Sequence, residues 1–306
     1  MTYSEIWHRI ATSYDDSEAR AIARILIEEL FGLSYADIVC GATEQLSADD
    51  TLRLDTAVRR IEQGEPLQHV LGYADFCGNR FCVNGSVLIP RPETEWLVDE
   101  GAKLMSGCIA SDEMQHKAPH SPKRILDIGT GSGCIAISLK LRLGDAYVEA
   151  WDISEEALRT AQDNADALKA EVVFRKRDAL RADNTAAPWD LIVSNPPYIC
   201  DSERSAMDDN VLLHEPHTAL FVPDDDPLRF YRAIARYALL TLNIGGSLLF
   251  ECNTRYAEAT GTMLSDMGFE EVTVSDDCFG LPRFVRGSSP SQPAAPPNPP
   301  RRGGLS

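Results

Sequence analysis

No apolar run in this 306-residue chain is long enough to cross a membrane. A membrane-spanning helix needs about 20 predominantly apolar residues. The first residues, MTYSEIWHRIATSYDD, are acidic and lack the apolar core of an export signal. We therefore expect a cytoplasmic protein that is neither embedded in a membrane nor exported.

The sequence also lacks the cysteine patterns of a metal or redox site. Its eight cysteines are scattered, with no CxxC pair and no Cys/His cluster of zinc spacing. His214 and His217 stand on either side of Pro216, which disfavours a regular helical presentation, and no third ligand is evident. We expect no bound metal, and thiols kept in a reducing compartment.

Positive charge is scarce. The chain holds 29 Lys and Arg against 47 Asp and Glu, a formal net charge of −18. Residues 1–65 alone hold 13 acidic residues and 6 arginines, a net charge of −7. Proteins bind nucleic acid largely by neutralising its phosphates with Lys and Arg. Direct nucleic-acid binding is therefore disfavoured.

Residues 1–65 are expected to form a small helical domain. Apolar side chains recur there at the spacing of a helix face, at Ile22, Leu26, Leu30, Leu54, Val58 and Ile61. Gly32 and Gly41 are typical helix stop signals. The pattern thus indicates several short helices with one shared core.

Residues 66–106 are expected to connect this domain to the rest of the chain. The stretch YADFCGNRFCVNG suggests a hairpin through Gly78 and Asn79. A helix is predicted to begin at Pro92, because proline suits the first helical turn. Residues 106–122 are polar and turn-rich, which predicts a loop.

Residues 107–286 alternate between strand and helix patterns. The predicted strands are RILDIG, YVEAWD, VVFRKRD, WDLIVS, GSLLFE and EEVTVS. Helices are predicted from Gly133, from Ser154, around 227–242 and around 254–267. This alternation predicts an α/β domain with a mainly parallel sheet covered by helices on both faces. The closing FVR is expected to be an antiparallel edge strand.

The last residues, 287–306, hold six of the 18 prolines and almost nothing apolar. Such a composition buries too little apolar surface to order the chain, which predicts a disordered tail. Deleting residues 288–306 is therefore expected to leave activity intact.

A glycine-rich turn follows the first predicted strand in ILDIGTGSGCIAISL, residues 125–139. Gly129, Gly131 and Gly133 lack Cβ atoms, which lets the turn tighten and a ligand approach the backbone. Ordinary βα turns also use one or two glycines, but three at this spacing favour a binding loop. A dinucleotide fingerprint would need glycine at 134, where Cys134 stands.

Two carboxylates follow the next strands. Asp152 ends the second strand, where it is able to accept hydrogen bonds from two ribose hydroxyls. It is also a candidate N-cap of the next helix, although Ser154 offers itself for that role. Asp178 follows the third strand and either borders an adenine or only caps a helix.

The fourth strand ends in WDLIVSNPPYIC, residues 189–200. Two prolines remove two backbone donors and fix two φ angles, so the segment is rigid and cannot continue a ladder. One interpretation is a strand terminator. The other is a preformed cradle in which the side chain of Asn195 and free carbonyl groups face a ligand.

These residues resemble known families. The glycine turn with Asp152 is similar to that of class I S-adenosylmethionine-dependent methyltransferases, and NPPY resembles the signature of enzymes that methylate a conjugated nitrogen. Four further stretches resemble the peptide chain release factor N5-glutamine methyltransferases of the HemK/PrmC family: LQHVLGYADFCGNRF (67–81), LIPRPETEWLVDE (88–100), EPHTAL (215–220) and DCFGLPRFVRG (277–287). The resemblance covers roughly residues 15–286.

The resemblance implies a Rossmann-like methyltransferase domain over 107–286 that takes its methyl group from S-adenosylmethionine. It also implies an N-terminal domain, residues 1–65, that helps to dock the release factor. The cofactor-binding residues would be Gly129, Thr130, Gly131, Ser132, Gly133, Asp152, Asp178, Ala179 and Asn195.

The implied target is the side-chain amide nitrogen of the glutamine in the Gly-Gly-Gln motif of release factors. A carboxamide nitrogen is a poor nucleophile because its lone pair is delocalised. The side-chain oxygen of Asn195 and the carbonyl of Pro196 would each accept one N–H of the target and aim its lone pair at the methyl group. Pro197 would keep this cradle stiff, and Tyr198 would pack against the planar amide.

Arg91, Glu93 and Glu95 would lie near the mouth of the site, although acids at these positions also suit an ordinary helix start. Two departures from the family pattern stand out. ECN at 251–253 replaces an expected glycine turn, which puts the local loop geometry in doubt. Ala179 replaces a bulkier residue beside the adenine, which puts the cofactor affinity in doubt.

Two other functions use the same motifs. An amino-group methyltransferase acting on DNA adenine or RNA guanine would share NPPY and the glycine turn, but the charge of −18 argues against it. A catalytically idle fold used as a binding module is disfavoured by the intact NPPY, glycines and Asp152.

Overall fold

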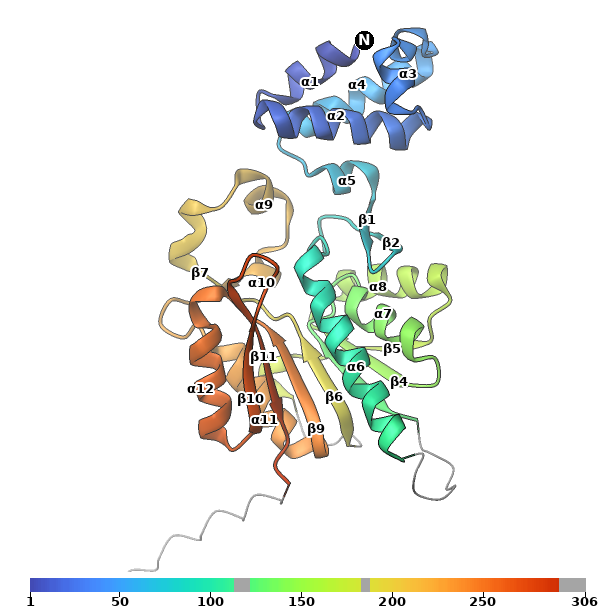
Figure 1. The fold of residues 1–306 in the computed structure, drawn as a ribbon. Coiled ribbons are helices and arrows are strands. Elements are labelled where there is room, and N and C mark those ends of the chain that lie inside the picture. The colour runs from blue at the N-terminus through green and yellow to red at the C-terminus, as the bar shows by residue number, and fades with distance from the viewer. Residues whose placement is uncertain (113–121, 183–187, 292–306) are drawn as a thin grey trace, which may run out of the picture.

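The computed structural model describes residues 1–112, 122–182 and 188–291. A bundle of helices is followed by a short connection and then by a seven-stranded sheet with helices on both sides (Figure 1). This arrangement confirms the predicted fold class, a helical N-terminal region joined through a β-hairpin to an α/β sheet. Within the described ranges, no helix combines the length and apolarity needed to cross a membrane.

The N-terminal bundle consists of α1 (Tyr3–Ile10), α2 (Asp16–Phe31), α3 (Tyr35–Val39), η1 (Ala42–Gln45) and α4 (Ala48–Glu62). Asp15 caps α2 by accepting hydrogen bonds from the backbone N–H groups of Ser17 and Glu18. α2 ends at Gly32, whose φ of 66° suits glycine. Helix faces carrying Ile6, Leu26 and Val58 enclose a core of their own.

The connection begins with α5 (Leu67–Leu71) and the hairpin of β1 (Tyr73–Phe76) and β2 (Asn79–Cys82). Phe76 pairs with Asn79, so the turn residues are Cys77 and Gly78. The hairpin prediction is confirmed, but the predicted turn was one residue too late. Both turn residues have positive φ, 49° and 74°, as a two-residue hairpin turn requires.

Pro92 opens the next helical segment, as predicted. It begins η2 (Pro92–Thr94), which leads directly into α6 (Glu95–Asp112). The loop predicted from residue 106 was wrong at its start, because α6 continues through Asp112. Residues 113–121 of that predicted loop lie outside the described residues.

The sheet has the strand order β10-β11-β9-β6-β3-β4-β5. Its strands are β3 (Arg124–Ile128), β4 (Tyr147–Asp152), β5 (Val172–Lys176), β6 (Trp189–Ser194), β9 (Leu242–Glu251), β10 (Glu270–Asp276) and β11 (Pro282–Ser288). The first five are parallel, and β11 is antiparallel to both β9 and β10. The prediction that the closing strand is antiparallel is confirmed, but its edge position was wrong: β10 forms the edge.

Helices cover both faces of this sheet (Figure 1). α6, α7 (Cys134–Leu143) and α8 (Glu155–Leu168) lie on one face, while α11 (Arg229–Thr241) and α12 (Ala257–Met267) lie on the other. Neighbouring strand residues alternate between the two cores: Leu191 and Val193 of β6 face α6, and Ile192 faces α11. This explains why the central strands are apolar throughout.

Short elements complete the fold: η3 (Ala179–Arg181), β7 (Ile199–Cys200), η4 (Asp201–Ala206), α9 (Asp209–His214), α10 (His217–Leu220), β8 (Phe221–Val222) and η5 (Thr254–Tyr256). Several contacts, among them the following two, tie the N-terminal bundle to the remainder. Arg80 of β2 lies 3.0 Å from Glu29 of α2, and the side chain of Tyr14 hydrogen-bonds with Asn210 of α9.

The predicted tail begins later than residue 287. β11 extends to Ser288, and the N–H of Ser289 donates to the carbonyl of Gly246 at 2.7 Å. Ser288 and Ser289 are both buried. Residues 287–291 therefore belong to the folded domain, and 292–306 lie outside the described residues.

Candidate functional site

A cavity of about 360 Å³ lies where β3, β4, β5 and β6 end. The strand order reverses beside β3, and parallel sheets bind ligands outside the carboxyl ends of their strands at such a point. Residues predicted from the sequence to form the site line it: Gly129, Gly131, Asp152, Asp178, Ala179, Asn195, Pro196 and Pro197. The structure therefore brings together residues from four separate strand ends.

The glycine turn is held by β4. The N–H groups of Gly129 and Thr130 both donate to the carbonyl of Trp151 at 2.9 Å. Gly129 has a φ of 78°, and a Cβ there would lie 3.9 Å from the carbonyl oxygen of Asn195. The positive φ is what favours glycine here, and the turn faces the NPPY segment across the cavity.

Thr130, Ser132 and Gly133 do not line the cavity. Thr130 is buried and donates its hydroxyl to Asp127 at 2.6 Å. Gly133 caps α7 with a φ of 83°, and a Cβ there would lie 2.9 Å from Ile137 and 3.1 Å from Ala161. These residues shape the turn and let α7 approach α8.

Asp152 offers its carboxylate to the cavity. One oxygen accepts from the N–H of Gly131 and the other from the N–H of Ser154, both at 2.9 Å. Each oxygen has further acceptor capacity. The cap of α8 is Ser154, whose hydroxyl accepts from Ala157. Burial raises the pKa of Asp152, so hydroxyl donors from a ligand would compensate lost hydration.

Asp178 caps a short helix and also faces the cavity, and its role beside an adenine stays a prediction. Its carboxylate caps η3 by accepting from the N–H of Leu180 at 2.9 Å, and it also lines the cavity. Ala179 and Leu180 continue the same wall. Leu180 was not predicted, because a lone leucine after a strand carries no signal of ligand contact.

Asp127, beneath the glycine turn, is fully buried. One carboxylate oxygen accepts from Thr130, and the other has no hydrogen-bond partner. Burial raises the pKa of Asp127 to about 7. Asp127 therefore supports the glycine turn from beneath through its bond with Thr130.

Asn195, Pro196 and Pro197 follow β6 and line the cavity, whereas Tyr198 lies behind them. The hydroxyl of Tyr198 donates to Glu251 at 3.3 Å, and burial raises the pKa of Tyr198. Its backbone N–H donates to the carbonyl of Leu220 at 3.2 Å. The tetrapeptide is therefore fixed on both sides and is not merely a strand terminator.

Two residues behind Asn195 were missed from the sequence. The side-chain NH₂ of Asn195 donates to the hydroxyl of Thr94 at 3.4 Å, and that hydroxyl donates to Glu251 at 2.7 Å. Thr94 lies in the PRPETE stretch and Glu251 begins ECN, but only the folded chain shows that they meet.

Arg91, Glu93 and Glu95 do not line the cavity. Arg91 lies 2.6 Å from Glu215, a buried carboxylate that also accepts from the N–H of Ile89. Glu93 lies near enough to Glu251 to raise the pKa of that carboxyl, although burial is the main cause. Glu95 instead accepts from the N–H of Cys77 at 2.6 Å and so holds the hairpin turn.

The unusual ECN sequence is accommodated without a glycine. Asn253 has a φ of −57° and caps η5. Its side-chain NH₂ donates to Glu203 at 2.9 Å and to the carbonyl of Tyr198 at 3.3 Å. Asn253 therefore supports the NPPY segment from behind.

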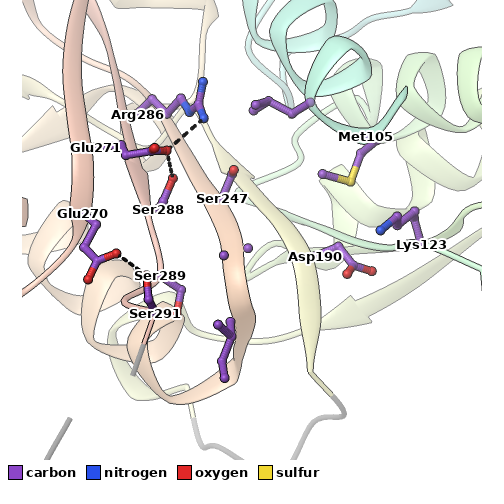
Figure 2. A pocket seen from close by; sticks show the side chains of 14 residues that line it. Met105, Lys123, Asp190, Ser247, Glu270, Glu271, Arg286, Ser288, Ser289 and Ser291 are labelled. Carbon is purple, nitrogen blue, oxygen red and sulfur yellow. Dashed lines mark hydrogen bonds and ion pairs between the residues drawn. The ribbon is translucent and has the colours of Figure 1, made fainter. Parts of the chain in front are cut away.

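A second cavity, of about 300 Å³, lies at the opposite end of the sheet (Figure 2). Glu271 accepts from Ser288 and lies 3.7 Å from Arg286, and Glu270 accepts from Ser291. Both glutamate side chains are therefore bonded to other residues that line the same cavity. Neither the glycine turn, Asp152 nor the NPPY tetrapeptide lines it, so we assign the functional site to the first cavity.

Among the described residues, no group of three or more His, Cys, Asp or Glu side chains is arranged to hold a metal ion. The seven cysteines whose side chains are described are all free thiols. Cys134, Cys200 and Cys252 are buried, whereas Cys40, Cys82 and Cys278 are exposed.

Two family models match the sequence. The PrmC N-terminal domain matches residues 6–72, and the Methyltransferase small domain matches residues 95–220. A release factor glutamine methyltransferase of Bacteroides thetaiotaomicron is 43% identical over 273 residues, which cover 89% of this chain and 93% of that protein. One from Flavobacterium psychrophilum is 36% identical over 281 residues, covering 90% and 94%.

Solved structures agree on the fold. The catalytic domain of hMettl16, in complex with the MAT2A 3′UTR hairpin 6, superposes with a TM-score of 0.52 at 17% identity. The match covers 82% of this chain and 84% of that one. At this identity the likeness concerns the fold alone.

Proposed function

Because this chain belongs to the release factor glutamine methyltransferase family, we propose that it methylates peptide chain release factors. The methyl group is transferred from S-adenosylmethionine to the side-chain amide nitrogen (N5) of the glutamine in their Gly-Gly-Gln motif, and S-adenosylhomocysteine and one proton from that nitrogen are released. The observation that carries this proposal is the cavity itself, where the glycine turn, Asp152 and Asn195 converge.

The cavity suits a nucleoside cofactor. Asp152 has acceptor capacity left on both oxygens for the ribose hydroxyls. Asp178, Ala179 and Leu180 form the adjoining wall, on which the adenine would lie. When bound, S-adenosylmethionine supplies an electrophilic methyl group on a sulfonium.

The NPPY segment supplies the acceptor groups for the target amide. The Asn195 side-chain oxygen and the Pro196 carbonyl each accept one N–H of the glutamine carboxamide, which directs the nitrogen lone pair toward the methyl group. Pro197 stiffens the segment, and the contacts of Tyr198 with Leu220 and Glu251 hold it in place. Alignment is thus built before substrate arrives.

Arg91 and Glu93 support the mouth of the site from the PRPETE stretch. The pairing of Arg91 with buried Glu215 fixes the EPHTAL segment against this stretch. In this proposal their role is to hold the substrate-binding rim in shape.

The N-terminal domain, residues 1–65, docks the release factor through its net charge of −7. Charge reversal on its exposed acidic residues tests this role, and we expect it to raise the KM for release factor.

The enzyme would act where translation terminates, in the cytoplasm. Transfer of labelled methyl from S-adenosylmethionine to intact release factor, and to bulk DNA and RNA in parallel, tests the proposal. We expect label on the release factor only, and its loss in N195A. Label on nucleic acid alone would replace this function by that of a base amino methyltransferase.

A further inference from the structure

Behind the cavity, three side chains form a line of hydrogen bonds. Asn195 donates to Thr94 at 3.4 Å, and Thr94 donates to Glu251 at 2.7 Å. Thr94 is 3% exposed and Glu251 is 1% exposed, so water does not compete for these groups. Asn195 is the only one of the three that lines the cavity. The line therefore leads from the protein interior to the site.

The direction of these bonds follows from proton counting. A threonine hydroxyl has one proton to donate, whereas a carboxylate only accepts. Because Glu251 takes the proton of Thr94, the hydroxyl presents lone pairs to Asn195. A lone pair attracts the side-chain NH₂ of Asn195 and repels its oxygen. The oxygen of Asn195 is thereby turned away from Thr94.

We propose that Glu251 and Thr94 are positioning residues that set the orientation of the Asn195 carboxamide, so that its oxygen faces the NH₂ group to be methylated. The inference rests on the function proposed above. With the carboxamide reversed, the NH₂ of Asn195 would meet the NH₂ of the target, donor against donor. The cradle would then be lost without any change in the shape of the cavity.

Hydrogen bonds from Thr94 and Tyr198 and the charge of Arg283 favour the ionised, accepting form of Glu251, against the burial that raises its pKa. Its second oxygen accepts from the hydroxyl of Tyr198 at 3.3 Å. The other charged groups that face Glu251 are Arg283, which pairs with Asp277 at 2.8 Å, and Glu93. The bond from Asn195 to Thr94 is long and therefore weak, as catalytic contacts often are without substrate. This bond affects the orientation of the Asn195 carboxamide more than the stability of the protein.

The test compares E251Q, T94V and T94S with the wild-type enzyme. The NH₂ of a glutamine at 251 is able to donate to Thr94, which frees the threonine proton to donate to Asn195 and favours the reversed carboxamide. We expect kcat to fall on the order of 10- to 100-fold in E251Q and T94V. The affinity for S-adenosylmethionine should stay within about twofold, and T94S should keep most of the activity.

Thr241→Val is the matched control. Thr241 is also a buried threonine whose hydroxyl is bonded, in this case to the carbonyl of Tyr237 at 2.8 Å. It lies in α11, outside the cavity lining. If T241V lowers kcat as much as T94V does, the loss reflects general destabilisation and the proposal is overturned.

A second readout does not depend on turnover. In ¹⁵N-labelled protein, the side-chain amide signals of Asn195, assigned from their loss in N195D, should shift in E251Q and T94V and stay in place in T241V. Unchanged signals would overturn the positioning role even if activity fell. If the wild-type enzyme fails to methylate release factor, the proposed function fails, while these signals still decide the inference.

Discussion

Replacing Asp127 by asparagine should change how the stability of the protein depends on pH. Asp127 is fully buried beneath the glycine turn, and burial raises its pKa from 3.8 to about 7. The hydrogen bond from Thr130 and the nearby backbone N–H of Ala136 oppose that shift, and the charge of Asp152 adds to it. Asparagine has nearly the same shape but does not titrate.

The sign follows from proton binding. Between its unfolded and folded pKa values, Asp127 holds more protons in the folded state, so its contribution to stability falls as pH rises through this window. The contribution is fully present below the unfolded value and lost above about 7. The full window corresponds to about 4 kcal/mol. From about pH 5 to about pH 8 the expected loss is about 3 kcal/mol.

Urea unfolding of the wild-type protein and D127N at these two pH values measures the effect. Other groups titrate equally in both proteins, so they cancel in the difference between the two free energies of unfolding. We expect D127N to gain about 3 kcal/mol relative to wild type between about pH 5 and about pH 8. A difference that stays constant with pH would refute the reasoning, because Asp127 would then not titrate in this range.

Three further predictions concern the site and the chain end. Gly133→Ala should lower the free energy of unfolding by about 1–3 kcal/mol in urea titrations, because of the positive φ and the close helix contact. Asp152→Asn should weaken S-adenosylmethionine binding on the order of 10-fold or more by calorimetry; Ser154→Ala should mainly cost about 1 kcal/mol of stability. Equal effects of these two variants on affinity would contradict the roles assigned. Truncation before residue 292 should leave the melting temperature unchanged. Removal of residues 288–306 should lower it, because Ser289 donates a hydrogen bond to Gly246. Equal melting temperatures of the two truncated proteins would contradict this.

Local sequence patterns were enough to predict the glycine turn, Asp152 and the NPPY segment. Each depends on a few consecutive residues after an apolar strand, and parallel strands bring their carboxyl ends together. The alternation of strand and helix patterns was also enough to predict where the five parallel strands and the helices between them lie along the chain. The packing role of Gly133 could not be predicted in this way, because it depends on Ala161 of α8.

Contacts between segments that are far apart in the chain could not be predicted from the sequence. Thr94 and Glu251 are 157 residues apart, and nothing local marks either as a partner of Asn195. Glu95 suited a helix start equally well, but the fold uses it to hold Cys77 in the hairpin turn. The insertion of β11 between β9 and β10 is likewise a tertiary choice, since an antiparallel strand fits an edge as well as an interior position.

The most direct test of the proposed function is to locate the transferred methyl group. Release factor, and the same factor with the Gly-Gly-Gln glutamine changed to alanine, are incubated with the enzyme and S-adenosylmethionine, digested and analysed by mass spectrometry. We predict a mass gain of one methylene on the glutamine peptide, with fragments that place it on the side-chain nitrogen, and no gain in the alanine variant. A methyl group on any other residue, or an unmodified glutamine peptide, would contradict the account.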